Sequence, residues 1–337
     1  MSSFGLIFFP RTATSVAGTA ELMDELGYDL LGFIDSHALA MDVYVALTLA
    51  ATRSSRIRLG PCVTNPVTRD LSVTAAAVAS LDLVSGGRAF LGISRGFSGA
   101  MSVGLRPGTT SSMADIVPRL RALMSGDPID ADGREMRLAW SKCAAPIMMA
   151  ASGPKALLIA GRVADAVLIH VGILPAVVSA AVARIRDGAK EAGRDPDAVE
   201  IWAHGAAACS PDGKVARESV KGTVAGMGAA VFTPNTTGKH VPADLEKPIA
   251  ELQREYRVTQ HMQRSDDHNV RLIERLGLAD YLVDRFAFAG TPDDIRKKVS
   301  MLETIGVTRF IFNLSTSPDV DATARALAMT LGISRRA

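Results

Sequence analysis

The chain has 337 residues, of which 48% are hydrophobic, and 37 basic against 35 acidic side chains give a formal net charge of +2. This balance gives no electrostatic reason to expect a nucleic-acid or anionic-membrane partner, which would need a clustered excess of lysine and arginine. The sequence shows no membrane-spanning stretch and no signal peptide, and its three distant cysteines predict neither disulfides nor a zinc site, so we expect a globular cytoplasmic protein.

Short apolar runs alternate with amphipathic segments along the whole chain, without a polar linker or an internal repeat. The apolar runs predict eight strands: Phe4–Phe9, Leu30–Ile34, Ile57–Cys62, Ala89–Ile93, Pro146–Ala150, Ala166–Val171, Glu200–Ala207 and Arg309–Asn313. The segments between them predict helices: Val16–Leu26, Asp42–Thr52, Val73–Val84, Met113–Met124, Ala156–Val163, Pro175–Gly193 and Pro292–Ile305. Eight such strands can close a parallel barrel, so residues 1–337 are predicted to form a single α/β domain, a (β/α)8 TIM barrel.

Two insertions interrupt this alternation. Phe97–Met113 follows the fourth strand and is rich in glycine and serine, whereas the long polar region 222–286 follows the seventh strand. Active sites of such barrels lie at the carboxyl ends of the strands, so we expect both insertions there, with residues 222–286 forming part of the substrate side. The alternative is that they are loops without a chemical role.

Two segments at predicted strand ends have patterns suited to ligand binding. Gly60–Arg69 (GPCVTNPVTR) leaves regular strand pairing at its prolines, which allows Asn65 and Arg69 to point into the barrel mouth. Ser85–Gly96 contains glycines that let a planar ligand approach the backbone, but it lacks the GxGxxG pattern that leads into a helix, so a Rossmann fold is disfavoured. The first segment is equally compatible with an ordinary strand exit.

The segment Ala151–Gly161 (ASGPKALLIAG) follows a predicted strand and begins a helix. The free amides of a helix N-terminus, with the Ser152 hydroxyl and the Lys155 ammonium beside them, make a cradle for a phosphate. A capped helix start with an incidental lysine has the same pattern.

Three histidines are candidates for catalysis or binding. His37 ends the second predicted strand, a position from which barrel side chains reach the active site. His261 and His268 are seven residues apart and would share one helix face, but neither belongs to an HExxH pattern. We therefore predict no metal site.

Several segments together resemble the luciferase-like flavin and deazaflavin oxidoreductases. Residues 59–94 resemble the main signature of that family, and residues 146–168 and 290–312 resemble its later signatures. Residues 4–10 (FGLIFFP) and 35–47 (DSHALAMDVYVAL) are similar to the methylenetetrahydromethanopterin reductase subgroup. The resemblance covers most of the chain in order, except Lys214–Lys247.

The resemblance implies a TIM barrel that binds FMN or the deazaflavin coenzyme F420 at the carboxyl ends of the strands. It places a non-prolyl cis peptide at Cys62–Val63, where it would back the ring, and it assigns the catalytic role near the reactive carbon to His37. The phosphate would lie on the cradle at residues 152–155. The resulting candidate cofactor-binding residues are Cys62, Val63, Thr64, Asn65, Ser152, Gly153, Pro154, Lys155 and Gly172.

Departures from the subgroup limit what can be transferred. The methylenetetrahydromethanopterin reductases carry a Glu in the first strand where this chain has Ile7, which puts reduction of that pterin in doubt. Ser36 replaces the Asp that precedes the second-strand histidine, removing a carboxylate that would raise its basicity. Arg95 can pair with an anionic group of a ligand or with a surface carboxylate. The candidate substrate-binding residues are Arg95, Tyr256, His261 and His268.

The leading functional hypothesis is an F420-dependent oxidoreductase that transfers a hydride between reduced deazaflavin and a C=C, C=N or C=O group of a small organic substrate. The main alternative is an FMN-dependent monooxygenase that uses reduced flavin and oxygen. A catalytically silent flavin-binding protein and a metal-dependent barrel lyase are further alternatives. A small-molecule substrate and a homodimer are expected, with no nucleic-acid or membrane partner.

Overall fold

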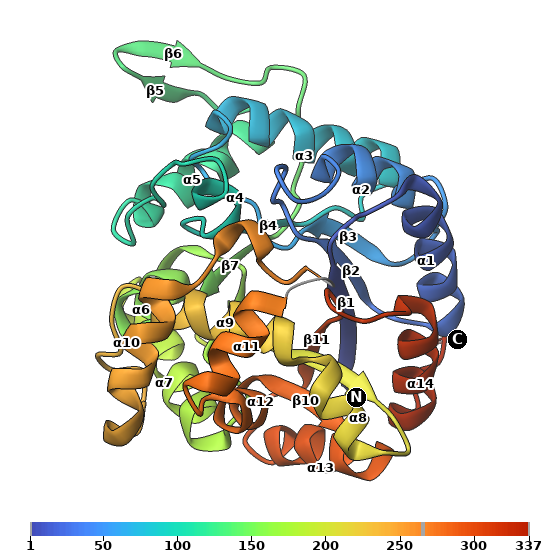
Figure 1. Cartoon of the computed structure of the whole chain (residues 1–337). Helices are drawn as coiled ribbons and strands as arrows, with labels where there is room; N and C mark the ends of the chain where they lie inside the picture. Colours follow the sequence, from blue (N-terminus) through green and yellow to red (C-terminus); the bar gives the residue numbers. More distant parts are fainter. Residues whose placement is uncertain (1, 264–266, 336–337) are drawn as a thin grey trace.

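A computed structural model describes residues 2–263 and 267–335 of the chain. Within them, eight parallel strands form a barrel in the order β3-β2-β1-β11-β9-β8-β7-β4 (Figure 1). Bridges from Leu59 to Ala89 and from Thr64 to Ile93 join the two ends of this order and close the barrel. The strands are β1 (Ser3–Phe8), β2 (Leu30–Phe33), β3 (Arg58–Pro61), β4 (Leu91–Ile93), β7 (Ile147–Ala151), β8 (Ala166–Ile169), β9 (Glu200–Cys209) and β11 (Arg309–Asn313). The predicted TIM barrel is confirmed.

Strand β9 is longer than predicted and has two partners on one side. Its first half pairs with β11 and its second half, Ala206–Cys209, pairs with the short strand β10 (Ala287–Gly290). The sequence analysis missed β10 because AFAG is only four residues long and directly follows a helix.

Helices cover the outside of the barrel. They are α1 (Ala13–Leu26), α2 (Val43–Ala51), α3 (Leu71–Ser85), α5 (Met113–Ser125), α6 (Pro154–Val163), α7 (Pro175–Glu191), α13 (Pro292–Glu303) and α14 (Val320–Leu331). As predicted, α1 stops at Gly27, whose φ of 92° lies in the left-handed region that glycine adopts without strain. Helix α14 was not predicted.

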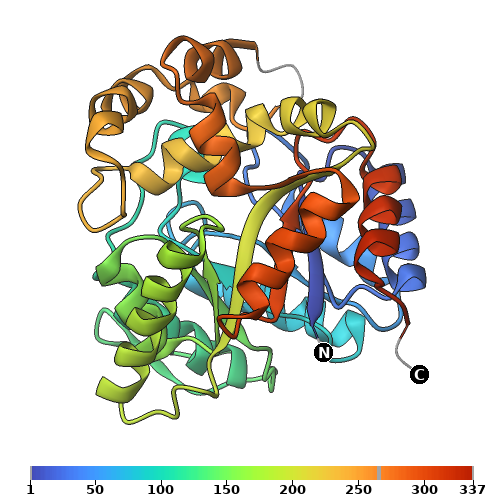
Figure 2. The ribbon, with the colours of Figure 1, turned by 90° about the horizontal axis from the view of Figure 1, so that it is seen from below.

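The insertions follow the fourth and seventh barrel strands, as expected. After β4 come α4 (Ser98–Met101), α5 and a hairpin of β5 (Ile129–Ala131) and β6 (Arg134–Met136). After β9 come α8 (Gly213–Ser219), α9 (Lys221–Phe232), η1 (Ala243–Leu245), α10 (Glu246–Glu255), η2 (Val258–Gln260), α11 (Asp267–Arg275) and α12 (Ala279–Phe286). Figure 2 shows this second group, from yellow to orange, on one end of the barrel.

The insertion after β9 has its own apolar core. Helix α9 is apolar on nearly every side and is surrounded by α10, α11 and α12, so its Val224, Met227 and Phe232 are fully buried. Inside the barrel, a separate cluster that includes Phe90, Leu168 and Trp202 fills the interior. These side chains fill the middle of the barrel, so the space towards the insertions is separated from the other end of the barrel.

No helix within residues 2–263 and 267–335 combines the length and hydropathy needed to cross a bilayer.

Candidate active site

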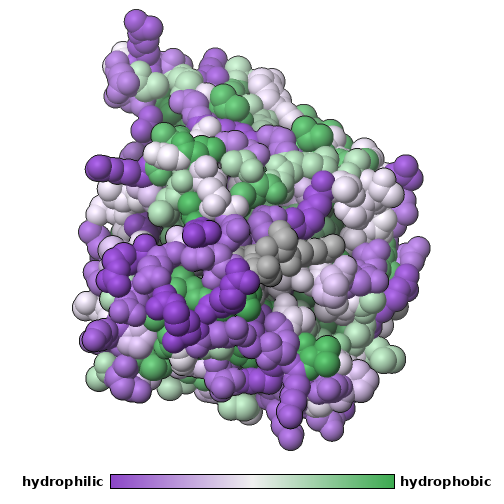
Figure 3. All heavy atoms as spheres, viewed as in Figure 1, coloured by the Kyte–Doolittle hydropathy of each residue, from purple (hydrophilic) through white to green (hydrophobic). Residues whose placement is uncertain are grey.

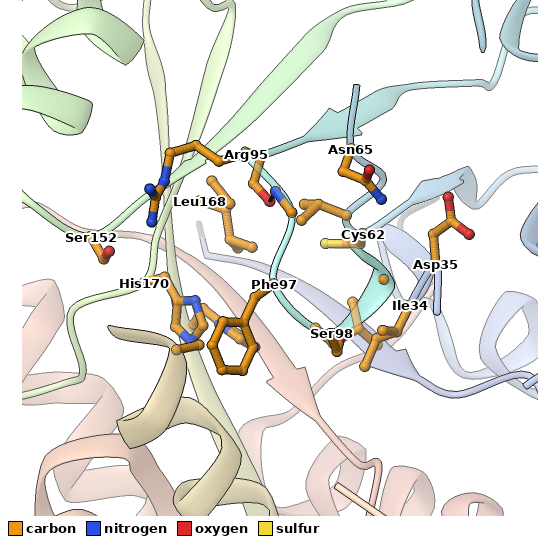
Figure 4. A pocket seen from close by; sticks show the side chains of 18 of the residues that line it. Ile34, Asp35, Cys62, Asn65, Arg95, Phe97, Ser98, Ser152, Leu168 and His170 are labelled. Atoms are coloured by element: carbon orange, nitrogen blue, oxygen red, sulfur yellow. Dashed lines mark hydrogen bonds between the residues drawn. The ribbon is translucent and has the colours of Figure 1, made fainter. Parts of the chain in front are cut away.

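A cavity lies at the carboxyl ends of the barrel strands, under the helices of the insertion. It encloses about 1030 Å³ of empty space, counting the part open to solvent. Its walls come from the eight barrel strands or the residues that directly follow them, and from both insertions: Ile7, Ile34, Asp35, Cys62, Val63, Asn65, Ser94, Arg95, Gly96, Phe97, Ser98, Gly99, Met149, Ala150, Ala151, Ser152, Ala156, Leu168, His170, His204, Ala230, His261, Met262 and Asn313. Figure 4 shows Asp35, Cys62 and Asn65 on one side and Ser152 and His170 on the other.

The peptide bond between Cys62 and Val63 is cis, as the resemblance implied. Both residues line the cavity, as does Asn65, whose Oδ1 accepts hydrogen bonds from the amides of Val67 and Thr68. Burial raises the pKa of the Cys62 thiol to about 12, so it stays protonated and is not a thiolate nucleophile at neutral pH. The segment that follows β3 therefore forms an uncharged part of the cavity wall.

Asp35 is held by residues of its own wall of the cavity. Its Oδ2 accepts hydrogen bonds from the Thr64 hydroxyl at 2.6 Å and from Arg69 at 2.7 Å, and Arg69 also pairs with Asp42. The other carboxylate oxygen, Oδ1, is buried without a partner. Thr64 was predicted to contact the cofactor, but its side chain is directed to Asp35 and it does not line the cavity.

Helix α6 begins at the cavity wall, as the phosphate-cradle pattern predicted. Gly153 is its N-cap and Pro154 its first residue, and no side chain caps its free amides. Ser152 and Ala156 line the cavity. Lys155, however, points outward, where its Nζ donates to the Ser111 hydroxyl at 2.6 Å.

Lys239, rather than Lys155, provides the ammonium group near the start of α6. Its Cε lies 3.7 Å from where a Cβ would stand on Gly153, and its ammonium donates to the carbonyls of Thr233 and Asn235. Only 7% of Lys239 is exposed. Burial, together with the positive charges of Arg95 and Arg285, lowers its pKa to about 8. Lys239 lies in the segment without family resemblance, so no motif could have indicated it.

Arg285 is a second buried cation near the start of α6. We call the start of α6, Lys239 and Arg285 together the phosphate seat. Arg285 is fully buried and donates to the carbonyls of Val171, Lys239 and His240 and to the Tyr281 hydroxyl. It fixes the backbone that carries Lys239. Arg285 and Lys239 also line a second cavity, which shares Ser152 with the first.

Gly172 was predicted to contact the cofactor, but it does not line the main cavity. Its φ is 102°, and an added Cβ would stand 2.4 Å from the carbonyl oxygen of Arg285. The glycine is therefore required for packing against Arg285.

Three histidines line the cavity: His170, His204 and His261. The rings of His170 and His204 are 4.9 Å apart between centroids. Burial lowers the pKa of His170 to about 4 and that of His261 to about 3, and it lowers the pKa of His204 well below its usual value. All three are therefore neutral at pH 7. His170 and His204 were missed, although each lies within a predicted strand whose other residues are mostly apolar.

The two insertions meet over the cavity through aromatic rings. The Phe97 ring lies 5.6 Å from His261 and 6.3 Å from Tyr256. The Tyr256 hydroxyl lies 2.7 Å from Nδ1 of His261, so Tyr256 orients this imidazole without lining the cavity itself. His268 is outside, with its Nε2 3.2 Å from the carbonyl oxygen of Glu255.

The family profile described as luciferase-like monooxygenase matches residues 9–309. The chain belongs to this family. It is 31% identical, over 94% of its length and 95% of the relative, to 5,10-methylenetetrahydromethanopterin reductase of Methanolobus tindarius. The corresponding reductase of Methanopyrus kandleri is 27% identical over 94% of both chains. These matches identify the chain as a luciferase-like oxidoreductase.

Solved structures of luciferase-like proteins have the same fold. The coenzyme F420 dependent tetrahydromethanopterin reductase from Methanopyrus kandleri superposes with a TM-score of 0.78 at 25% identity, covering 98% of both chains. An F420-dependent secondary alcohol dehydrogenase in complex with an F420-acetone adduct gives 0.75 at 17% identity, covering 99% of both chains.

The placement of His37 corrects its predicted role in this luciferase-like chain. Strand β2 ends at Phe33 rather than Ile34, and His37 is exposed in the turn that follows, so it does not line the cavity. The neighbouring Ser36 is buried and shares a 2.7 Å hydrogen bond with Ser98. Asp35, which was not predicted, is the residue of this segment that faces the cavity.

Within the part of the chain that the structure describes, no three His, Cys, Asp or Glu side chains are grouped so as to hold a metal ion.

Proposed function

We propose that this chain is an F420-dependent oxidoreductase that transfers a hydride between the deazaflavin and a small organic substrate. The observation that carries this proposal is the phosphate seat, where the free amides at the start of α6 lie beside the buried cations Lys239 and Arg285 of the adjoining cavity, for which the described residues provide no carboxylate partner. A bound deazaflavin supplies the hydride chemistry. The protein's share is to bind and orient the reactants and to exclude water.

The cavity residues fit a phosphorylated ring cofactor. The Cys62–Val63 peptide and Asn65 form a wall with little charge, suited to a planar ring. The Ser152 hydroxyl, the first amides of α6 and Lys239 would hold the phosphate, with Arg95 next to them. Without an anion, a buried ammonium beside two guanidinium groups is electrostatically unfavourable, as the lowered pKa of Lys239 indicates.

The relatives support a deazaflavin over FMN, because those at 31% and 27% identity are methylenetetrahydromethanopterin reductases and a solved relative is F420-dependent. A monooxygenase from Streptomyces bottropensis shares the fold at 20% identity, which supports the fold alone. Ile7 lines the cavity where those reductases carry the Glu that the sequence comparison noted, so we do not assign the pterin as the substrate. We assign the substrate side of the cavity to the region 222–286, which contributes Ala230, His261 and Met262.

Fluorescence titration of the purified chain with F420 and with FMN tests the cofactor. We expect F420 to bind at least tenfold more tightly, because its acidic tail extends beyond the phosphate and adds contacts in the second cavity, which Arg285 lines. The same titration with the non-phosphorylated deazaflavin should show weaker binding. Tight FMN binding without deazaflavin binding would contradict the proposal and favour the monooxygenase.

The proposal includes a homodimer formed through α2 and α3. Helix α2 carries no charged residue and α3 carries one, although both lie at the surface, where helices usually have a polar outer face. Val45, Val73 and Leu83 are between 54% and 72% exposed, and Figure 3 shows apolar and weakly polar side chains over this part. Sedimentation velocity should show a dimer that Leu83→Glu dissociates, whereas Met329→Glu on α14 should not.

A further inference from the structure

Two histidines at the floor of the cavity have nitrogens without hydrogen-bond partners. His204 on β9 is 3% exposed, and neither its Nδ1 nor its Nε2 has a partner. His170, which follows β8, has a buried Nε2 that is also without one. The third cavity histidine differs, because the Tyr256 hydroxyl lies against Nδ1 of His261. Among the three cavity histidines, nitrogens without a partner are therefore found on His170 and His204.

Buried polar atoms in native proteins nearly always have a partner, so three such nitrogens on a cavity wall indicate that a molecule entering the cavity supplies one. Both rings are neutral, because burial lowers their pKa. A neutral imidazole offers one N–H donor and one acceptor nitrogen. The occupant should accordingly both accept and donate hydrogen bonds.

The charges around the pair disfavour a charged occupant. Of the described residues that line the cavity, Asp35 is the one carboxylate; its charge is compensated by Arg69, and it lies across the cavity from His170 (Figure 4). An amine at His204 would therefore lie in a buried site without a counter-ion. Arg95, the cation among these lining residues, is assigned to the phosphate seat, where its charge lowers the pKa of Lys239. A carboxylate between the imidazoles would give up its hydration for one N–H of each ring, and the acceptor nitrogens of the two neutral rings would face its negative charge.

We propose that His170 and His204 form a substrate-recognition subsite that selects an uncharged alcohol or ketone over a carboxylate or an amine. A hydroxyl supplies both a donor and an acceptor, and the carbonyl oxygen of the corresponding ketone accepts from the same N–H. One oxygen can thus stay bound in both redox states. Naming this occupant as the substrate rests on the proposed function, whereas the hydrogen-bonding preference of the pair does not.

The test is nuclear magnetic resonance of the full chain with ¹⁵N-labelled histidine, with and without F420. His170→Asn and His204→Asn assign the two rings, and His204→Gln replaces the latter variant if it does not fold. The probes are cyclohexanol, cyclohexanone, acetate and methylammonium at millimolar concentrations. We expect the alcohol and the ketone to shift both the His170 and His204 signals and to leave those of exposed His37 and outlying His268 in place. His204→Asn should weaken alcohol binding about tenfold.

The proposal is overturned if neither neutral probe shifts the two signals, or if acetate or methylammonium shifts them equally. It is also overturned if His204→Asn binds the alcohol as tightly as the unaltered chain, since the pair would then be structural. Failure of F420 to bind in the same samples would contradict the proposed function alone, because the probe titrations without F420 still report on the imidazoles.

Discussion

The two walls of the cavity differ in whether their buried charged side chains have a counter-ion. On the β2–β3 wall, Asp35 is neutralised by Arg69, which is shared with Asp42. On the wall made by α6 and the insertion, the described residues provide no carboxylate partner for Lys239 or Arg285, whose hydrogen bonds go to carbonyl and hydroxyl oxygens. The buried carboxylate of the first wall has its counter-ion within the protein, whereas the buried cations of the second wall would gain one when an anion binds. A substitution should therefore affect stability on the first wall and ligand affinity on the second.

The largest effect is expected for Arg69→Met. Asp35, with 1% of its side chain exposed, would lose its counter-ion and remain a buried charge. We expect the free energy of unfolding to fall by about 3–5 kcal/mol, measured by urea denaturation. Arg53→Met, which breaks an exposed pair with Glu21, is the control and should cost less than about 1 kcal/mol. Equal losses in the two variants would contradict the contrast between the walls.

Lys239→Met should show the opposite behaviour. Affinity for F420 should fall about 10- to 100-fold, because a charge-assisted hydrogen bond to the phosphate is lost. The free energy of unfolding without ligand should not fall by more than about 1 kcal/mol, because no partner charge is left behind. The matched control is Lys155→Met, which removes an exposed ammonium that is directed away from the cavity to Ser111 and should leave F420 affinity unchanged. Fluorescence titration and urea denaturation of both variants give the comparison.

The pH dependence of stability and of F420 affinity provides a further test of the role of Lys239. Burial lowers its pKa to about 8, so above pH 8 the folded chain releases a proton that the unfolded chain keeps up to its ordinary pKa of 10.5. The unfolded state then binds more protons, so this residue's contribution to stability rises between pH 8 and 10.5. F420 affinity should fall over the same interval, as the ammonium is lost. Titrations at several pH values should show both trends in the unaltered chain and neither in Lys239→Met.

The smallest effect is expected for His37→Ala. The side chain is exposed and outside the cavity, so F420 affinity should change by less than about twofold. Stopped-flow measurement of deazaflavin oxidation would provide the kinetic counterpart. A large loss of rate in this variant would restore the catalytic role that the family resemblance implied.

The barrel was predictable because each strand carries its own local signal. Phe4–Phe9 and Arg309–Asn313 are apolar, β-branched or aromatic runs between helix signals, and both form barrel strands within one residue of the predicted ends. The start of α6 was predictable for the same reason, since Gly-Pro after a strand marks a helix N-terminus.

The remaining site residues could not be predicted, because they are brought together by contacts distant in sequence. Lys239 reaches Gly153 through the fold of the insertion and through Arg285, 46 residues further along the chain. His170 and His204 become a pair only because β8 and β9 are neighbours in register. Spacing along the chain contains none of this information, and it did not indicate that Asp35 rather than His37 lines the cavity.

The double pairing of β9 also affects how this enzyme can be redesigned. The chain leaves the barrel after Cys209 and returns as β10, which is hydrogen-bonded alongside Ala206–Cys209. The entry and exit of residues 210–286 are thus joined side by side, whatever the length or sequence between them. We therefore expect that a corresponding segment from another member of the family can replace residues 210–286. The exchange would change the side of the cavity that the insertion forms, while the β9–β10 pairing would keep the register of the barrel.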